Sequence, residues 1–313
     1  MERDQEKDKE QFIEKDQQEQ ENKYEIESPF KIVFRRFFKD KLAITGMIML
    51  FMVLALILIG PFFTKDPSTI NIVMKNMPPS SDNILGTDAL GRDFLARVLE
   101  GGRFSFFVGF AATIISVFLG TLLGLIAGYY GGVIDMIIMR IVDILMSIPT
   151  LPLLIILAAF LSDLEVNPKY RIYITLGLLA FIFWTTYCRS VRGIVLLLRE
   201  QEYMQATEAL GFSTIRKLFG HLLPNILPYV ILYIATGLGS MMIFEASLSY
   251  LGLGVQPPYA SLGNLLQTTR NFFDLTRRVW LWIPPTLLLF VSVLSINLVG
   301  EGLRNAVDPR LKK

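Results

Sequence analysis

Residues able to act as a nucleophile, a general base or a metal ligand are scarce in this sequence. The chain has 313 residues but only one histidine, His221, and one cysteine, Cys188. Neither an intramolecular disulfide nor a thiol or imidazole metal cluster can therefore form. Ser147, Ser240 and Ser247 are available as nucleophiles, but the single histidine lies in a polar interval of the sequence. Because a serine nucleophile needs a base within hydrogen-bond reach, we expect no enzymatic activity in this chain.

Cofactor-binding motifs are missing as well. The sequence contains no G-x-x-x-x-G-K-[S/T] phosphate loop, so the chain does not hold ATP in that way, and it contains no H-E-x-x-H, G-x-S-x-G or C-x-x-C motif. The 30 Lys and Arg residues nearly balance the 28 Asp and Glu residues, giving a net charge of +2. We therefore expect no cofactor in this chain and no nucleic-acid partner.

The composition points to a membrane protein. Hydrophobic residues make up 52% of the chain, more than a soluble core of this size needs. Six long apolar runs are each long enough to cross a bilayer as a helix. The sequence thus predicts an all-α polytopic membrane protein with six transmembrane helices. The predicted spans are Leu42–Phe63, Phe104–Tyr130, Val133–Leu161, Ile172–Cys188, Leu222–Phe244 and Val279–Gly300.

The third of these runs is unusual because its first part carries Asp135, Arg140 and Asp143. Charges inside a span are costly and normally pair or face water, and the i, i+3 spacing would let Arg140 pair with Asp143. The charged part could instead be an interfacial helix, with the span itself restricted to Ile144–Leu161. In either case Pro149, followed by Pro152, predicts a kink.

Charge placement predicts the orientation and a division into three parts. Basic residues between Lys31 and Lys41 precede the first span, and another basic cluster runs from Arg189 to Lys217. Positive charge marks the cytoplasmic side, which places both termini in the cytoplasm. We expect residues 1–28 to be a disordered acidic tail, 29–103 to hold the first span and an extracytoplasmic loop, and 104–313 to form the core, with five spans and a cytoplasmic loop at 200–224.

Three glycines at four-residue spacing, Gly120, Gly124 and Gly128, lie on one face of the second span. Glycines in this register let another helix approach closely. We expect this face to pack against a neighbouring helix.

Two acidic features fall on the predicted external side. Asp82, Asp88 and Asp93 could in principle form a calcium site, although their spacing does not match a calcium loop. Glu245 follows the fifth span, where it is either a buried structural pin or exposed.

A polar interval between the fourth and fifth spans looks folded. Tyr203, Ala206 and Leu210 fall at i, i+3 and i+7, so they share one face of a short amphipathic helix. Gly211 follows where a helix usually stops, because glycine accepts the left-handed conformation at little cost.

A second helix is expected after this glycine, with Ser213 as its N-cap. Arg216 and Lys217 should point away from its apolar stripe, and Pro224 and Pro228 should break the helix before the next span. The stripe consists of Ile215, Leu218, Phe219 and Leu222.

Four motifs in this order resemble the oligopeptide/dipeptide (peptide/nickel) group of ATP-binding-cassette importer permeases. They are LGTDALGRD, the QATEALG…LP loop, EASLSYLGLGVQPP and LRNAVDPRL, and the resemblance covers the chain from about Ser28 onward. The loop is similar to the "EAA" loop of that family. It departs from the family pattern at Gln205, which replaces a glutamate, at Thr207 and at His221.

The resemblance implies a type I importer permease fold in a bacterial cell membrane. It further implies a paralogous second permease subunit, two ATPase subunits that bind ATP and Mg²⁺, and an extracytoplasmic substrate-binding protein. The expected cargo is oligopeptides or dipeptides, although glutathione and nickel chelates are carried on the same scaffold. By this resemblance the ATPase-coupling loop comprises Tyr203, Gln205, Ala206, Thr207, Glu208, Ala209, Leu210, Gly211, Leu223 and Pro224.

Two other interpretations are weighed against this one. A pair of amphipathic helices can simply lie on the headgroups without binding a partner. A secondary transporter driven by an ion gradient would show broken helices near the bilayer midplane and two matching halves, and no second half matches the third span.

Overall fold

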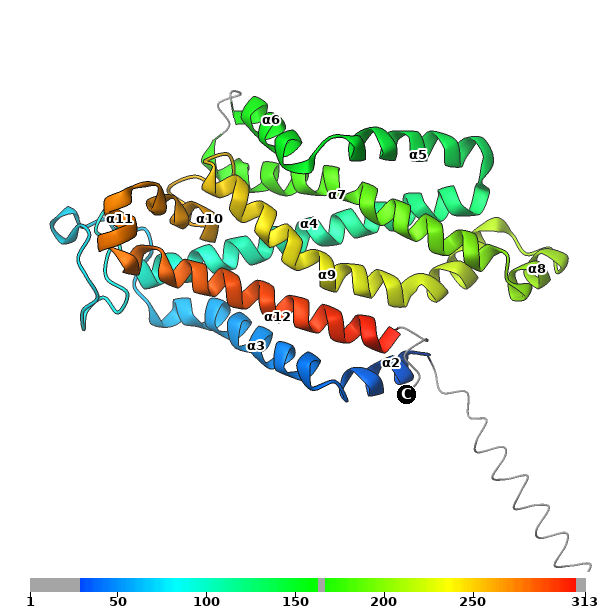
Figure 1. The fold of residues 1–313 in the computed structure, drawn as a ribbon, viewed down its shortest axis with the longest axis horizontal. Helices are drawn as coiled ribbons and strands as arrows, with labels where there is room; N and C mark the ends of the chain where they lie inside the picture. Colours follow the sequence, from blue (N-terminus) through cyan, green and yellow to red (C-terminus); the bar gives the residue numbers. More distant parts are fainter. Residues whose placement is uncertain (1–28, 163–166, 308–313) are drawn as a thin grey trace, which may run out of the picture.

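The computed structural model describes residues 29–162 and 167–307, and within these ranges the fold is all-α (Figure 1). The predicted acidic tail, the end of the LRNAVDPRL motif and part of the interval between the third and fourth predicted spans lie outside the described residues. The α-helices are α2 (Pro29–Phe37), α3 (Lys41–Ile59), α4 (Phe94–Tyr130), α5 (Gly132–Ser147), α6 (Thr150–Ser162), α7 (Pro168–Arg199), α8 (Glu202–Ala209), α9 (Leu223–Tyr250), α10 (Leu262–Leu265), α11 (Phe272–Arg277) and α12 (Ile283–Val307).

The long helices match the predicted spans. Five helical segments are long and apolar enough to cross a membrane, and the bent pair α5–α6 makes a sixth if it counts as one span. Helix α4 begins at Phe94, ten residues before the predicted span, so the span and the residues that precede it form one helix. Its start is fixed by Asp93, whose carboxylate accepts a hydrogen bond from the Ala96 N–H (2.9 Å).

The third span is bent by 89° between α5 and α6, as the prolines predicted. The bend falls inside both spans proposed from the sequence, Val133–Leu161 and Ile144–Leu161, so neither of them is a straight helix. The expected Arg140–Asp143 pair is wrong, because Asp143 pairs with Arg189 of α7. Asp135 likewise accepts two bonds from Arg192 of α7, at 2.5 and 2.6 Å. These pairs cross from one helix to its neighbour, which the spacing within α5 does not reveal.

The glycine face of α4 packs against α7, as predicted. A Cβ atom at Gly120 would lie 2.7 Å from the Trp184 carbonyl oxygen, and one at Gly124 would lie 2.6 Å from the Cys188 carbonyl oxygen. Gly128 is similarly close to Val195. The backbones of α4 and α7 therefore approach closely because these positions have no side chain.

Helix α10 inserts between α4, α9 and α12 and closes one end of the bundle. A Cβ atom at Gly263 would lie 2.2 Å from the Ala246 carbonyl oxygen, and the Ser105 hydroxyl accepts a bond from the Leu262 N–H (3.1 Å). Beside it, Glu245 is fully buried within α9 and accepts a bond from the Ser249 hydroxyl (2.7 Å). The buried interpretation of Glu245 is confirmed, and the exposed one is wrong.

The three aspartates considered for calcium do not gather into a metal site. Asp88 pairs with Arg92 at 2.7 Å, and Asp93 caps α4. Among the described residues no group of three His, Cys, Asp or Glu side chains is arranged to hold a metal ion. The calcium hypothesis is therefore wrong for the described part of the chain.

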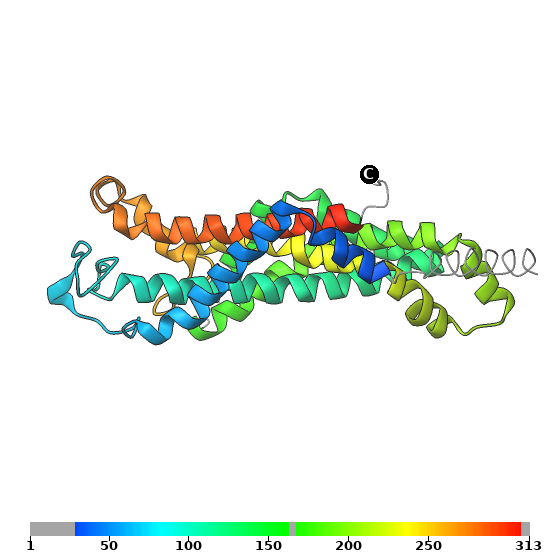
Figure 2. The same cartoon turned by 90° about the horizontal axis from the view of Figure 1, so that it is seen from below.

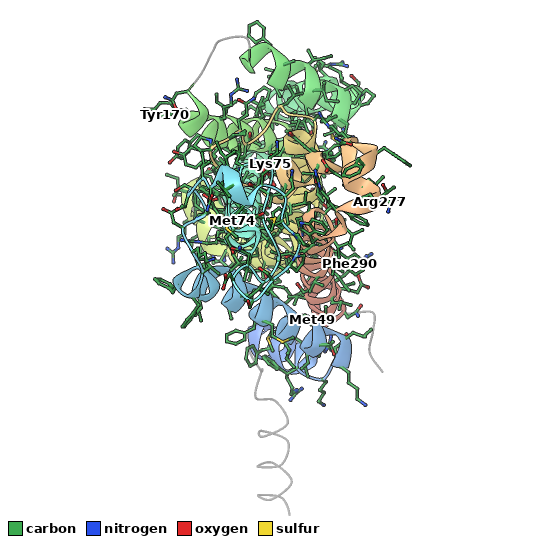
Figure 3. All side chains as sticks on the ribbon, turned by 90° about the vertical axis from the view of Figure 1, so that its left-hand side faces the viewer. Met49, Met74, Lys75, Tyr170, Arg277 and Phe290 are labelled. Carbon is green, nitrogen blue, oxygen red and sulfur yellow. The ribbon has the colours of Figure 1, made fainter. Side chains whose placement is uncertain are left out.

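The bundle is elongated and its two ends differ. Helices α2 and α8 and the last turns of α12 lie at one end, whereas α10, α11 and the loop of residues 64–93 lie at the other (Figures 1 and 2). Figure 3 views the molecule from the α11 end, with Met74, Lys75 and Arg277 labelled. Helix α8 is thus separated from the long loops by the whole length of the spans.

Candidate coupling helix and comparison with known proteins

Helix α8 is short because its sequence ends it at Gly211. This glycine has φ +69°, the left-handed conformation predicted from the sequence. Its N–H bonds the Glu208 carbonyl (2.9 Å), and the Phe212 N–H bonds the Thr207 carbonyl (3.1 Å). These two bonds form a Schellman motif, which satisfies the carbonyl groups left over at the end of the helix.

The predicted apolar face of α8 points away from the rest of the protein. Tyr203 and Leu210 are 37% and 71% exposed, and Ala206 between them is also exposed. Partial burial of the Tyr203 ring raises the pKa of its phenol, which is neutral at neutral pH even without this shift. An exposed, uncharged, partly apolar face on a short helix at the end of the bundle is suited to contact with another protein.

The opposite side of α8 holds the helix to the bundle through Met204, which the sequence analysis missed. Met204 is 4% exposed and Thr207 is 6% exposed. Met204 was detectable as the one large apolar residue of α8 that lies off the Tyr203–Leu210 face. It packs in a cluster with Leu125 of α4, Val191 and Val195 of α7, Leu218 and Leu222 of the following segment, and Ile226 of α9.

Polar contacts add to this attachment. Arg199, at the end of α7, donates to the Tyr129 carbonyl (3.1 Å), where its charge complements the C-terminal end of α4. Lys217 lies over the Tyr129 ring, 5.7 Å from its centre, and 3.9 Å from the Glu208 carboxylate. The prediction that Lys217 points outward is wrong, since its side chain is buried against α4, whereas Arg216 is exposed and stacks on Phe212.

The second predicted helix is a π-helix, η3 (Arg216–Leu222), and it runs directly into α9. The predicted break at the prolines is wrong. The Leu223 N–H bonds the Leu218 carbonyl five residues back, and this wider turn accommodates Pro224, which has no N–H for the usual bond. Ser213 precedes this helical stretch, and its carbonyl accepts a bond from the Lys217 N–H (3.0 Å).

The π geometry also divides the predicted apolar stripe. Leu218 and Leu222 are buried, whereas Ile215 and Phe219 are 72% and 52% exposed. A π-helix has more residues per turn than an α-helix, so residues spaced for an α-helix no longer share one face. The continuous segment from Arg216 to Tyr250 makes the base of α9 part of the same rod as η3.

The positions where the loop departs from the family pattern also have defined surroundings. The Gln205 side-chain amide donates to the Glu200 carbonyl (3.4 Å) and is exposed. The Thr207 hydroxyl donates to the Met204 carbonyl (2.7 Å) on the buried side of α8. Glu208 and Ala209 are exposed, and Leu223 and Pro224 form the first turn of α9. Of the ten predicted site residues, eight therefore lie in or next to α8 and two at the base of α9.

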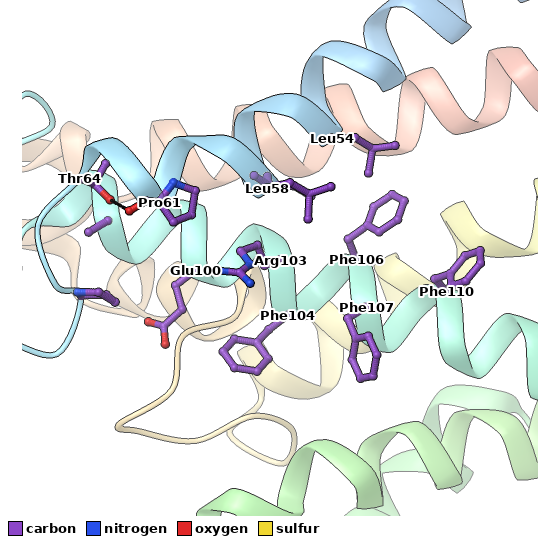
Figure 4. Close-up of a pocket in the computed structure, with 13 residues that line it drawn as sticks. Leu54, Leu58, Pro61, Thr64, Glu100, Arg103, Phe104, Phe106, Phe107 and Phe110 are labelled. Atoms are coloured by element: carbon purple, nitrogen blue, oxygen red, sulfur yellow. Dashed lines mark hydrogen bonds between the residues drawn. The ribbon is translucent and has the colours of Figure 1, made fainter.

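A cavity of about 580 Å³ lies near the opposite end, between α3 and α4 (Figure 4). Most of its lining is apolar, including Leu54 and Phe107, with Glu100 and Arg103 among the few charged residues. Its position separates it from α8, and it contributes no residue to the candidate coupling site.

Comparison with known proteins places this geometry in a family. Residues 120–313 match the model described as binding-protein-dependent transport system inner membrane component, and residues 28–79 match the N-terminal TM domain of oligopeptide transport permease C. The oligopeptide transport system permease protein OppC of Bacillus subtilis is 37% identical over 287 residues, covering 91% of each chain. The dipeptide transport system permease protein DppC of Alkalihalophilus pseudofirmus is 36% identical over 293 residues, covering 93% of each chain.

A more distant relative agrees with these matches. The dipeptide transport system permease protein DppC of Haemophilus influenzae is 33% identical over 293 residues, covering 91% of this chain and 96% of its own. The matches extend through α3, the long helices and the α8 segment. The chain therefore belongs to the family of inner membrane components of binding-protein-dependent transport systems, as a multi-pass permease subunit and not as an enzyme.

Proposed function

We propose that this chain imports oligopeptides or dipeptides as one half of a permease heterodimer. In this proposal a paralogous permease forms the other half, two ATPase subunits bind ATP and Mg²⁺, and an extracytoplasmic protein delivers the peptide. The cargo follows from the relatives, which are named as oligopeptide and dipeptide permeases. The core formed by residues 104–313 matches the transport family over most of its length, and 29–103 supply α3 and the external loop.

The orientation we propose places α2 and α8 in the cytoplasm of a bacterial cell, together with both termini. Arg35 and Arg36 lie in the last turn of α2, and Arg199 and Arg216 flank α8. Basic residues next to spans favour the cytoplasmic side. The loop of residues 64–93 and helices α10 and α11 then face the binding protein.

The observation that carries the proposal is the two-sided character of α8. Its exposed face, formed by Tyr203, Ala206 and Leu210, is free to contact an ATPase subunit, while Met204 on the other side is held among α4, α7 and α9. We propose that closure of the ATPase pair moves α8 as a rigid body within the loop of residues 200–224. Because the attachments of α8 reach three spans, the motion would switch the permease between outward- and inward-facing states.

Co-purification tests the proposed function directly. When the tagged chain is extracted in mild detergent from the membranes of its native cell, we expect an ATPase and a second permease to accompany it. The purified complex should hydrolyse ATP only when Mg²⁺ is present, and cells that lack the chain should lose uptake of labelled peptides. Uptake that persists after ATP depletion and follows an ion gradient would instead identify a secondary transporter.

A further inference from the structure

Helix α9 exposes a mainly polar face along its span, interrupted by Ile243, which is 49% exposed. Asn225, Thr236 and Ser240 are exposed, and Tyr229 and Ser247 are partly exposed. At 100° per residue, these five positions fall within roughly one sixth of the helix circumference. At about 1.5 Å per residue the face is roughly 33 Å long, which matches the hydrocarbon thickness of a bilayer.

The other side of α9 is apolar and faces α4. Val230 and Ile234 line a hollow of about 470 Å³ together with Ile114 and Phe118 of α4. At 100° per residue, these residues lie roughly 80–160° round α9 from Thr236 and Ser240. The helix thus separates an apolar side, suited to lipid or to helix packing, from a polar side.

Helix α12 extends the polar face beside Ser240. Asn297 is exposed, and its side-chain oxygen would lie 2.9 Å from a Cβ atom at Gly239. Gly300 of α12 packs closely on Thr236, because a Cβ atom at Gly300 would lie 2.9 Å from the Thr236 methyl group. Figure 1 shows α9 lying between α7 and α12.

The hydrogen-bonding of these side chains is incomplete. The Thr236 and Ser247 hydroxyls donate to carbonyl groups one turn earlier, at 2.9 and 2.8 Å, which leaves their oxygen lone pairs facing outward. Within the described part of the chain, neither the Ser240 hydroxyl nor the Asn297 amide has a hydrogen-bond partner. A carboxamide exposed to hydrocarbon would leave donors and acceptors unsatisfied, which costs several kcal/mol per group.

We propose that this face, from Asn225 to Ser247 of α9 with Asn297 of α12, is the water-facing wall along which the cargo passes. A contact with the partner permease is the competing explanation. Such contacts usually gather small residues near a crossing point, whereas Gly237 and Gly239 are buried against neighbours in this chain. Five polar positions spread over the length of the span, with Ile243 as the apolar exception, are better suited to an aqueous passage.

The chemistry of the wall also indicates how it meets the cargo. Its polar side chains carry hydroxyl or carboxamide groups, and between Asn225 and Ser247 this face has no carboxylate, ammonium or guanidinium group. Hydroxyl and carboxamide groups hydrogen-bond to the backbone N–H and C=O groups of a peptide, whatever side chains the peptide carries. The wall should therefore tolerate peptides of either charge. This inference about selectivity rests on the proposed peptide cargo, whereas the aqueous position of the wall does not.

Cysteine labelling tests the position of the wall in the assembled transporter. In a Cys188→Ala background, single cysteines replace Thr236, Ser240 or, as a lipid-facing control on α3, Phe51, which is 72% exposed. A charged methanethiosulfonate reagent should label the first two and not the third, and labelling should stop uptake. Absence of labelling at both wall positions, or labelling only when the partner permease is missing, would overturn the proposal.

A charge placed on the wall tests the selectivity. Ser240→Asp should reduce uptake of acidic peptides about ten-fold more than uptake of basic peptides, because like charges repel at close range. Ser240→Asn, of similar size but neutral, should not discriminate. If Ser240→Asp and Ser240→Asn reduce uptake equally, for acidic and for basic peptides, Ser240 does not face the cargo and the proposed wall is contradicted. If the cysteine-free parent imports no peptide although its single-cysteine derivatives are labelled at positions 236 and 240, the proposed cargo fails and the wall remains.

Discussion

Replacing Ala206 with arginine should abolish peptide uptake while leaving the protein folded in the membrane. Ala206 is exposed at the centre of the α8 face and touches no buried cluster, so the substitution has little effect on the bundle. A long charged side chain there would separate α8 from a docked ATPase. Disturbing the centre of a protein contact typically costs about 2 kcal/mol or more, which weakens docking about 30-fold or more.

The expected signature is uncoupling, measured as the ratio of peptide imported to ATP hydrolysed. Ala206→Ser is the matched control, because it keeps a small uncharged residue at the same position and should retain uptake. Normal transport by the arginine variant, at normal protein levels in the membrane, would show that this face is not a docking surface.

Replacing Gly124 with valine should prevent the permease from folding correctly. A Cβ atom there would lie 2.6 Å from the Cys188 carbonyl oxygen and 2.9 Å from the Val191 Cβ, so α4 and α7 would have to separate. Overpacking usually costs about 1–3 kcal/mol, and contact with backbone places this substitution at the upper end of that range. The amount of monodisperse protein recovered in detergent should fall several-fold.

Gly193→Val on α7 is the control for this effect. A Cβ atom at Gly193 meets nothing within 4 Å, so the valine should leave the yield and the melting temperature nearly unchanged. Equal losses for the two variants would mean that valine itself harms these helices, and that the close approach of α4 and α7 is not the cause.

Features that depend on local sequence were predictable. The apolar runs gave the spans, the glycine spacing gave the α4–α7 contact, and Gly211 gave the end of α8. Each follows from backbone geometry or from side-chain periodicity within one helix, which a single sequence contains.

Features that depend on tertiary contacts between distant segments could not be predicted from the sequence. Met204 gains its importance from α4, α7 and α9, which are distant in the sequence. Asp143 had a suitably spaced arginine on its own helix, yet Arg189 of α7 is its partner. Pro224 was expected to break a helix, but a π turn, which local propensity does not indicate, absorbs it.

Photo-crosslinking from α8 is the most direct measurement of the central claim, that its exposed face contacts the ATPase. A photoreactive amino acid at Leu210, 71% exposed, is compared with one at Phe34 of α2, 67% exposed at the same end of the bundle. We predict an adduct with an ATPase subunit from position 210 and none from position 34. Adducts with lipid alone from position 210, or equal ATPase adducts from both positions, would contradict this account.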